Sequence, residues 1–417
     1  MNINQQIIDG FHSPEELEKL YREHKKEFCD FFNSNTEYSD SELFKFWKVR
    51  LAAETSHSRH KVLKSDIIFV ILVSVFSGLL LKLPDFFAQL DRNSFYLRNL
   101  SLILFNALIY YAFWQNKLFA KRELVGYTIS IAALAVYVNL LPVTKSDSVQ
   151  LALLHLPVLL WYLFGWVMVS FEWKNLNQRM NYIRFSGEFL VMTGLIMIGG
   201  GLLTAISINM FSAIGMNIEN FWMEYVVIFG GAALPVVSVF LINIYPDITG
   251  KITPVLARIF SPLAMITLAV YLVFLLLSGN SNVMKDRNLL IILNIILFAV
   301  LVLVLFSISE IDKSKKKNAG VFVLFLLTLL AILVDVVAIT AIISRLFNGF
   351  TPNRTVVFGF NVLIFINLII LLRKLFHSFF HPETLEEVEL SIARYLNVYF
   401  LWALIVVFVL PVLFSFR

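Results

Sequence analysis

The chain has 417 residues, of which 59% are hydrophobic and only 15% are charged. Soluble globular domains average about 45–50% apolar and about 25% charged residues. With a mean hydropathy of +0.78, the composition excludes a soluble globular protein, a disordered chain, a collagen and a disulfide-stapled scaffold. It predicts an all-α polytopic membrane protein, a bundle of transmembrane helices.

Residues 1–60 are the only sizeable polar region and are predicted to form a cytoplasmic helical segment. Ser13 and Pro14 are typical of a helix start, and a second amphipathic stretch leads from Leu43 to Leu51. We expect two amphipathic helices that are too short for a core of their own and that pack on each other and on the membrane domain. A basic collar, residues 56–64, follows. The segment is a candidate binding site for a cytoplasmic protein partner.

Residues 61–417 are predicted to form the membrane domain, whose main partner is the lipid bilayer. A span needs about 20 predominantly apolar residues. Eleven spans are predicted, at residues 66–83, 98–114, 124–142, 150–171, 187–210, 223–245, 255–278, 288–309, 319–347, 354–376 and 396–416. Residues 382–395 carry apolar side chains on one side and are predicted to form an amphipathic helix at the cytoplasmic interface.

The basic residues of the loops predict how the chain is oriented. With the N-terminus inside, the cytoplasmic segments hold 25 Lys and Arg residues and the outer segments hold nine. Without the N-terminal segment, which alone carries ten, the ratio is still 15 to nine. Because cytoplasmic loops carry an excess of Lys and Arg, we expect a cytoplasmic N-terminus and an external C-terminus. The net charge of +5 then reflects this bias, and no nucleic-acid partner is expected.

Polar residues inside predicted spans are candidates for function because they are costly in hydrocarbon. Asp335 lies near the middle of span 319–347, where a carboxylate must be protonated, paired or in contact with water. One interpretation is a proton or cation site. The alternative is a structural carboxyl that is hydrogen-bonded to a neighbouring helix.

We predict a polar cluster between spans 319–347 and 354–376. Arg354 and Asn361 are seven residues apart and therefore lie on nearly the same helix face, and Asn353 can cap the start of that helix. Arg345 belongs to the cluster but lies about 15 Å along the helix from Asp335. Arg354 or Asn361 is therefore the expected contact of Asp335.

Further candidates lie at the ends of other spans. Arg184 and Glu188 are four residues apart and can form an ion pair on one helix face. His155 precedes Pro157, which frees a backbone carbonyl, so a structural role is favoured for it. Arg258 is a further basic candidate on the cytoplasmic side.

Glycines interrupt two neighbouring predicted spans at mid-depth. They are Gly199, Gly200 and Gly201 in the first, and Gly230 and Gly231, followed by Pro235, in the second. Such interruptions in two spans are typical of broken helices around a transported substrate. The alternative is close helix packing through small residues.

No phosphate-binding loop, zinc-protease, serine-hydrolase or thiol-redox motif occurs. No cofactor and no metal site is expected, and the oligomeric state is not predicted. The leading hypothesis is a transporter or permease for a small solute. The alternatives are a non-catalytic membrane assembly or sensing component, and a membrane-embedded enzyme acting on a lipid-linked substrate.

Several stretches together resemble a known family. They are Asp335 to Arg345, the run Gly349-Phe350-Thr351-Pro352-Asn353-Arg354, Gly359-Phe360-Asn361, His155-Leu156-Pro157, the pair Arg184 and Glu188, and Ala257-Arg258-Ile259-Phe260-Ser261-Pro262. They resemble an uncharacterised family of bacterial multi-pass membrane proteins, domain of unknown function 4153, over roughly residues 60–416. The resemblance implies a protein of the bacterial inner membrane, and it implies no activity.

Overall fold

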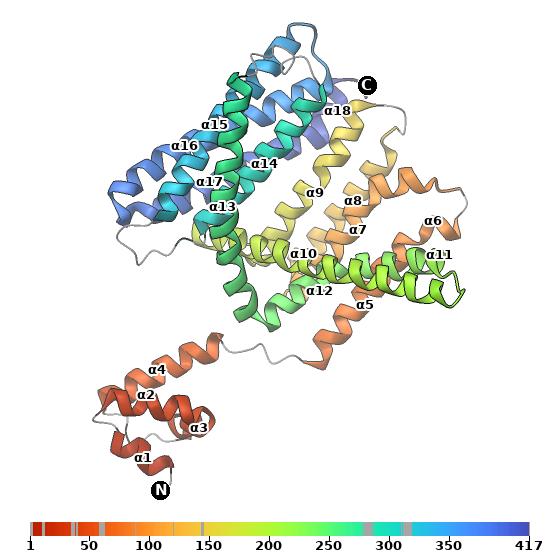
Figure 1. Cartoon of the computed structure of the whole chain (residues 1–417). Coiled ribbons are helices and arrows are strands. Elements are labelled where there is room, and N and C mark those ends of the chain that lie inside the picture. Colours follow the sequence, from red (N-terminus) through yellow and green to blue (C-terminus); the bar gives the residue numbers. More distant parts are fainter. Residues whose placement is uncertain are drawn as a thin grey trace. The chain divides into compact units, whose positions relative to one another are not determined.

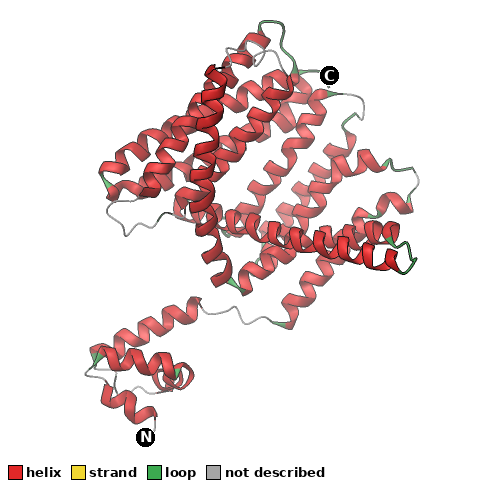
Figure 2. Ribbon diagram, viewed as in Figure 1, coloured by secondary structure: helices red, strands yellow, loops and turns green. Residues whose placement is uncertain are grey.

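The computed structural model describes residues 3–10, 13–34, 38, 41–57, 63–87, 89–119, 121–142, 146–277, 287–309, 311 and 319–416. Within these residues the chain is helical and has no strand (Figure 2). The all-α class predicted from composition is therefore confirmed. The chain divides into two compact units, Met1–Leu63 and Lys64–Arg417, and each is described by itself.

The described residues of the first unit form four helices, where the sequence predicted two. They are α1 (Ile3–Asp9), α2 (Pro14–Glu23), α3 (Lys25–Ser34) and α4 (Glu42–His57). The predicted helix start is confirmed, because the Ser13 hydroxyl accepts a hydrogen bond from the Glu16 amide at 3.4 Å. Residues 58–62 of the predicted basic collar lie outside the described part of the chain.

Aromatic side chains form the core of this unit. Phe28, Phe44 and Trp47 are at most 2% exposed, and the rings of Phe28 and Trp47 meet edge to face at 4.9 Å. Arg50 lies over the Trp47 ring at 4.4 Å and is paired with Glu18 at 2.7 Å. Each buried aromatic removes about 150–250 Å² from water, so a few short helices suffice. The expectation that this segment lacks a core of its own is wrong.

The second unit is a bundle of long helices. In chain order it contains α5 (Lys64–Leu81), α6 (Leu83–Phe86), α7 (Arg92–Gln115), α8 (Arg122–Leu140), α9 (Asp147–Met168), α10 (Leu176–Ala213), α11 (Glu219–Phe221), the π-helical η2 (Trp222–Val227), α12 (Ile228–Ile244), α13 (Pro246–Leu277), α14 (Arg287–Ser309), α15 (Ala319–Leu346), α16 (Pro352–Phe380), the 3₁₀ turn η3 (Pro382–Thr384), α17 (Leu385–Leu404), the π-helical η4 (Ile405–Val409) and α18 (Leu410–Leu413).

Ten helical segments among the described residues are long and apolar enough to cross a membrane, where the sequence predicted eleven. The predicted span 98–114 is helical but is not one of the ten. It lies in α7, where Arg98, Asn99 and Asn106 interrupt the apolar run. Length and composition thus define a polytopic integral membrane protein.

The C-terminal segment departs from the prediction. Residues 382–395 were expected to form a helix separate from span 396–416, but α17 continues without a break from Leu385 to Leu404. The apolar face of the expected interfacial helix, which includes Val388 and Ile392, is buried in the bundle. Residues 395 and 396 are Tyr and Leu, and neither is a helix breaker. One long helix therefore replaces the expected pair.

The helices of the bundle differ in direction. α15 and α16 form an antiparallel hairpin, α17 packs on α16, and α13 and α14 pack on α15. Figure 1 shows α10 running across the steeper helices α9 and α13. With 38 residues, α10 is about 57 Å long. Beyond Met192 its only buried residue is Ser207, so the second half of α10 presents an apolar surface suited to lipid.

Two phenylalanines of α4 give a matched test of the aromatic core. Phe44 is 1% exposed and Phe46 is 60% exposed. Phe44→Ala should destabilise the first unit by about 3–5 kcal/mol, whereas Phe46→Ala should change its stability by less than about 0.5 kcal/mol. Hydrogen exchange of residues 3–57 in the full chain measures both effects. Equal protection in the two variants would contradict a core centred on Phe44.

Candidate functional site

Buried and half-buried polar side chains lie along α16, which packs on α15 and on α17. We call this set the polar layer, and it consists of Asp335 of α15, Asn361 and Asn367 of α16, and Tyr399 of α17. Asp335 and Asn361 are fully buried and Asn367 is 1% exposed. Such burial of a carboxyl group inside an apolar bundle is costly, so the layer is the strongest candidate site.

The hairpin geometry explains why Asp335 and Asn361 lie in one layer. α15 ends at Leu346 and α16 begins at Pro352, so the two helices run in opposite directions from a short turn. Asp335 and Asn361 are similar numbers of residues from that turn. At about 1.5 Å per residue, they lie at nearly the same depth.

Tyrosines of α17 complete the layer. The Asn367 side-chain amide donates a hydrogen bond to the Tyr399 hydroxyl at 2.8 Å. The Tyr399 hydroxyl is also within electrostatic range of the Asp335 carboxyl. Tyr395 packs edge to face on Tyr399 and donates from its hydroxyl to the Leu363 carbonyl at 2.7 Å. The tyrosines therefore connect α17 to the polar face of α16.

Most polar atoms of the layer have no hydrogen-bond partner among the described residues. This holds for both carboxyl oxygens of Asp335, for both amide atoms of Asn361 and for the side-chain oxygen of Asn367. Buried polar groups in proteins are nearly always hydrogen-bonded. The layer therefore keeps the capacity to bind a proton, a small cation or a polar group.

Close helix contact surrounds the layer. A Cβ atom at Gly359 would overlap the ring of Trp402, so only glycine allows α16 and α17 to approach this closely. The contact lies half a turn of α16 from Asn361. The contact therefore joins α16 and α17 on a side of α16 other than the one that carries Asn361.

The predicted polar cluster is divided between two places. Asp335 and Asn361 belong to the polar layer, whereas Arg354 lies at the turn and donates to the carbonyls of Arg345 at 2.9 Å and Gly349 at 2.8 Å. Asn353 donates to Asp147 at 2.5 Å. Arg354 therefore does not hydrogen-bond to Asp335, because its guanidinium satisfies carbonyls at the end of α15.

The cap of α16 also differs from the prediction. Thr351, and not Asn353, is the N-cap residue, and its hydroxyl accepts from the Arg354 amide at 3.4 Å. Pro352 occupies the first helical position, as is common. Asn353 thus lies inside the first turn, where its side chain is free to reach the start of α9.

Sequence reasoning did not assign Tyr395 and Tyr399 to the site. Both lie in α17, and Tyr395 was placed on a helix at the membrane interface. Their spacing of four residues puts both on one helix face, but that pattern does not identify the face that they meet. Asn367 lies six residues after Asn361, and this spacing alone also predicts no shared neighbour.

Arg184 forms an ion pair with a different acid from the one predicted. Its guanidinium meets Glu389 of α17 at 3.1 Å and donates to the Ser309 carbonyl at 2.8 Å. The side chain of Glu389 is 5% exposed. Arg184 therefore joins α10, α14 and α17, and within the described part of the chain its ion pair is with Glu389 and not with the predicted Glu188.

The two remaining polar candidates are not part of the layer. His155 uses Nδ1 to hydrogen-bond the Leu151 carbonyl one turn earlier in α9 at 2.9 Å, which agrees with a structural role. Arg258 is exposed on α13. No group of three or more His, Cys, Asp and Glu side chains suited to a metal occurs among the described residues.

The glycine pattern marks no helix break. α10 continues through Gly199, Gly200 and Gly201, and α12 continues through Gly230, Gly231 and Pro235. A Cβ atom at any of these five glycines would meet nothing within 4 Å. Neither the broken-helix interpretation nor close packing within this chain is therefore supported. The irregular stretch is η2 (Trp222–Val227), which directly precedes α12.

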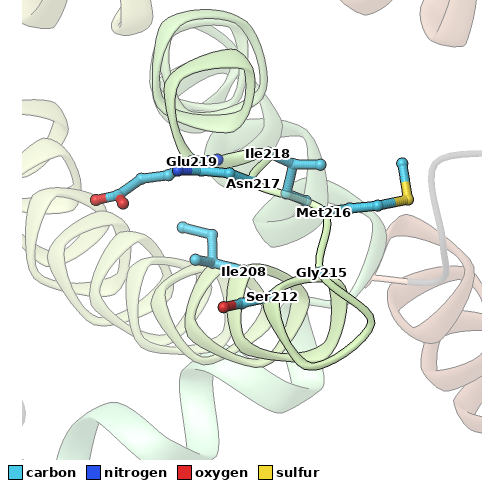
Figure 3. Close-up of a pocket in the computed structure, with 7 residues that line it drawn as sticks. All are labelled: Ile208, Ser212, Gly215, Met216, Asn217, Ile218 and Glu219. Carbon is cyan, nitrogen blue, oxygen red and sulfur yellow. Dashed lines mark hydrogen bonds between the residues drawn. The ribbon is translucent and has the colours of Figure 1, made fainter.

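A small hollow lies at the turn between α10 and α11. Figure 3 shows its lining side chains, which include Ile208, Ser212, Asn217 and Glu219. Its volume is about 230 Å³. Gly215 makes the turn with a φ of 81°, a conformation that favours glycine. The hollow is a feature of this turn and contains no residue of the polar layer.

No protein family, no curated protein and no solved structure was found to match this chain.

The pair Arg184–Glu389 can be compared with a surface pair of the same type. Lys374 meets Glu387 at 3.2 Å, but the Glu387 side chain is 64% exposed. Arg184→Met removes a charged hydrogen-bond partner of the buried Glu389 and should cost about 1.5–3 kcal/mol. Lys374→Met should cost less than about 1 kcal/mol. Thermal unfolding of the detergent-solubilised protein measures both, and equal effects would contradict the structural role of Arg184.

Proposed function

We propose that this protein is a permease-like transporter for a small solute, and that the Asp335 carboxyl takes up and releases a proton or a small cation during transport. The polar layer is the observation that supports this proposal. It combines a fully buried carboxyl, unpaired amide groups and long apolar helices. Ionisable residues at such depth commonly mark ion pathways and proton relays.

The surroundings of Asp335 favour an uncharged or neutralised carboxyl group over a bare carboxylate. A bare carboxylate in an apolar bundle is strongly disfavoured, whereas a protonated or cation-bound Asp335 is not. The side-chain oxygen of Asn361, which lies at nearly the depth of Asp335, is a neutral ligand of the kind that binds a small hard cation. Binding or release of a proton or cation at Asp335 would therefore change the stability of the packing of α16 on α15 and α17. A bound ion shifts a conformational equilibrium in this way.

Two alternatives differ in their support. A non-catalytic assembly or sensing component is favoured by the separate folded unit at the N-terminus. A membrane-embedded enzyme would need acids and bases gathered at one membrane face. Arg184 is instead engaged by Glu389, and Arg258 is exposed on α13.

The cellular setting belongs to the same proposal. We propose a location in the bacterial inner membrane, in accordance with the resemblance to the family of domain of unknown function 4153. The excess of basic residues in alternate loops, counted for eleven crossings that include residues 98–114 of α7, supports a cytoplasmic N-terminus and an external C-terminus. A cytoplasmic protein partner of residues 1–60 also remains a proposal.

The protonation state of Asp335 can be observed directly. In the infrared spectrum of the reconstituted protein, we expect a carbonyl stretch from a protonated carboxylic acid, because burial disfavours the charged form. Asp335→Asn should remove this band. Asp85→Asn is the matched control: Asp85 is paired with Lys82 and Arg92, and the hydrogen bond from Lys82 holds the pKa of Asp85 below its usual value.

Two results would contradict an Asp335 that is loaded by a proton. One is a band that persists in Asp335→Asn, and the other is a band that never responds to pH. If Asp335→Leu retained every activity of the unmodified protein, the carboxyl would have no functional role.

Access of water separates a transport site from a dry structural layer. With Cys29 replaced by Ser, single cysteines at Ala331 and Ala338 lie on the Asp335 face of α15, one turn to either side. Both positions are buried. Ile343 is 38% exposed on the surface of the bundle, and a cysteine there is the control for a position outside the polar layer.

A transporter should let a membrane-impermeant thiol reagent reach Ala331→Cys or Ala338→Cys in some state of its cycle. We expect at least one of them to react with the reagent in the folded protein, because a transport site must be reached by water. The total number of reactive thiols is measured after denaturation. If neither cysteine reacted under any condition, the transport proposal would be wrong and Asp335 would be structural.

A further inference from the structure

Helix α4 has two distinct faces. Its inner face contributes Phe44, Trp47 and Leu51 to the aromatic core, each at most 6% exposed. Its outer face carries Phe46 and Val49, which are 60% and 70% exposed. These two residues are three positions apart and therefore adjacent on the helix surface. A folded unit with its own core thus leaves two large apolar side chains outside that core.

Exposed lysines flank this apolar pair. Lys45 and Lys48 are both exposed, and Lys45 lies one turn before Val49. Arg50 belongs to the inner face instead, because it is paired with Glu18 and lies over the Trp47 ring. The Lys48 Nζ lies 5.8 Å from the centre of the Phe44 ring, so Lys48 borders the outer face, whereas Lys45 lies on it. The outer face of α4 therefore combines apolar tips with exposed cationic side chains, the combination found in helices that lie in a membrane interface.

The charge of the unit is distributed unequally along the chain. Residues 1–40 carry four Lys and Arg against nine Asp and Glu, and residues 41–63 carry five against two. The net charge thus changes from −5 to +3 between the two parts of the unit. A negatively charged surface would attract the α4 end of the unit and repel its other helices.

The covalent connection keeps α4 near a bilayer. Residues 58–63 separate the end of α4 at His57 from the start of α5 at Lys64, and a chain of this length reaches at most about 25 Å. α5 is one of the ten segments that are long and apolar enough to cross a membrane. The short connection therefore gives the N-terminal unit a high effective concentration at the membrane that α5 enters.

We infer that the outer face of α4 docks on an anionic phospholipid surface, with Phe46 and Val49 inserted at the headgroup level and Lys45 and Lys48 beside the lipid phosphates. Apolar insertion and attraction of lysines to anionic lipid act together in such docking. The inference concerns the N-terminal unit alone and does not depend on the function of Asp335.

A fluorescent reporter on the full chain tests this docking. Cys29→Ser removes the only cysteine, and Phe46→Cys then carries an environment-sensitive probe in nanodiscs that contain a lipid-attached quencher. Lys19→Cys, an exposed position on α2, is the matched control in the acidic part of the unit. The discs contain either phosphatidylcholine alone or a mixture with an anionic phospholipid.

We expect lipid quenching of the probe at position 46 in anionic discs, and weak quenching in phosphatidylcholine discs or at position 19. In the same reporter, Lys45→Glu with Lys48→Glu should lower the docked-to-undocked ratio by roughly 30-fold, since each lysine near an anionic surface contributes about fivefold. One molar NaCl, which shortens the Debye length to about 3 Å, should act in the same direction.

Three results would overturn the inference. The first is a probe at position 46 that stays in water in anionic discs. The second is equal lipid quenching in both disc types, which would remove the role of the lysines. The third is a probe that is shielded from water but is not quenched by lipid, which would indicate that a protein surface, and not lipid, covers the outer face of α4. A probe at Val49→Cys repeats the measurement and guards against a local effect of the first label.

Discussion

Satisfaction of backbone carbonyls at helix ends is the constraint on which the membrane unit depends. The last turn of every helix leaves carbonyls without an intrahelical partner, and hydrocarbon offers no water to replace it. Side chains of neighbouring helices supply the donors here. Arg98 of α7 donates to the carbonyls of Asn139 and Leu141 at the end of α8, at 2.6 and 2.5 Å. Arg354 does the same for α15, and Asn116 does so for α9.

The same constraint makes the polar layer an exception. The arginines just named use their guanidinium groups on carbonyls, and Arg184 uses its own on Glu389 and Ser309. Asp335 and Asn361 have no such partner among the described residues, although both are fully buried. Neighbouring side chains satisfy carbonyls at the ends of α8, α9 and α15, whereas the polar layer holds five of the ten buried side-chain atoms without a partner among the described residues. This concentration of unpaired atoms favours a layer retained for chemistry rather than for stability.

The N-terminal unit is built on a different balance. It precedes the long apolar helices in the sequence, and its stability rests on aromatic rings that exclude water from a small core. Phe28, Phe44 and Trp47 meet in this core, and the Arg50–Glu18 pair covers one side of it. The chain thus joins a unit stabilised by burial from water to a unit stabilised mainly by van der Waals packing in lipid.

The sequence by itself determined the class of the protein and most of the helices. Apolar runs of span length predict helices whatever their neighbours are, because the hydrocarbon forces each run to satisfy its own backbone. Asp335 stood out for the same local reason, as a charge in such a run. The Ser13 cap was also predictable, because a capping side chain bonds within its own turn.

Only the tertiary structure decided which polar groups meet. Arg354 and Asn361 share a helix face, yet one reaches the carbonyls at the end of α15 and the other lies beside the buried layer. Tyr399 joins that layer from a helix expected to be elsewhere, and Arg184 pairs with Glu389, 205 residues away in sequence. Local periodicity specifies the direction of a side chain relative to its own helix. Its partner depends on how neighbouring helices pack, a long-range property that one sequence does not display.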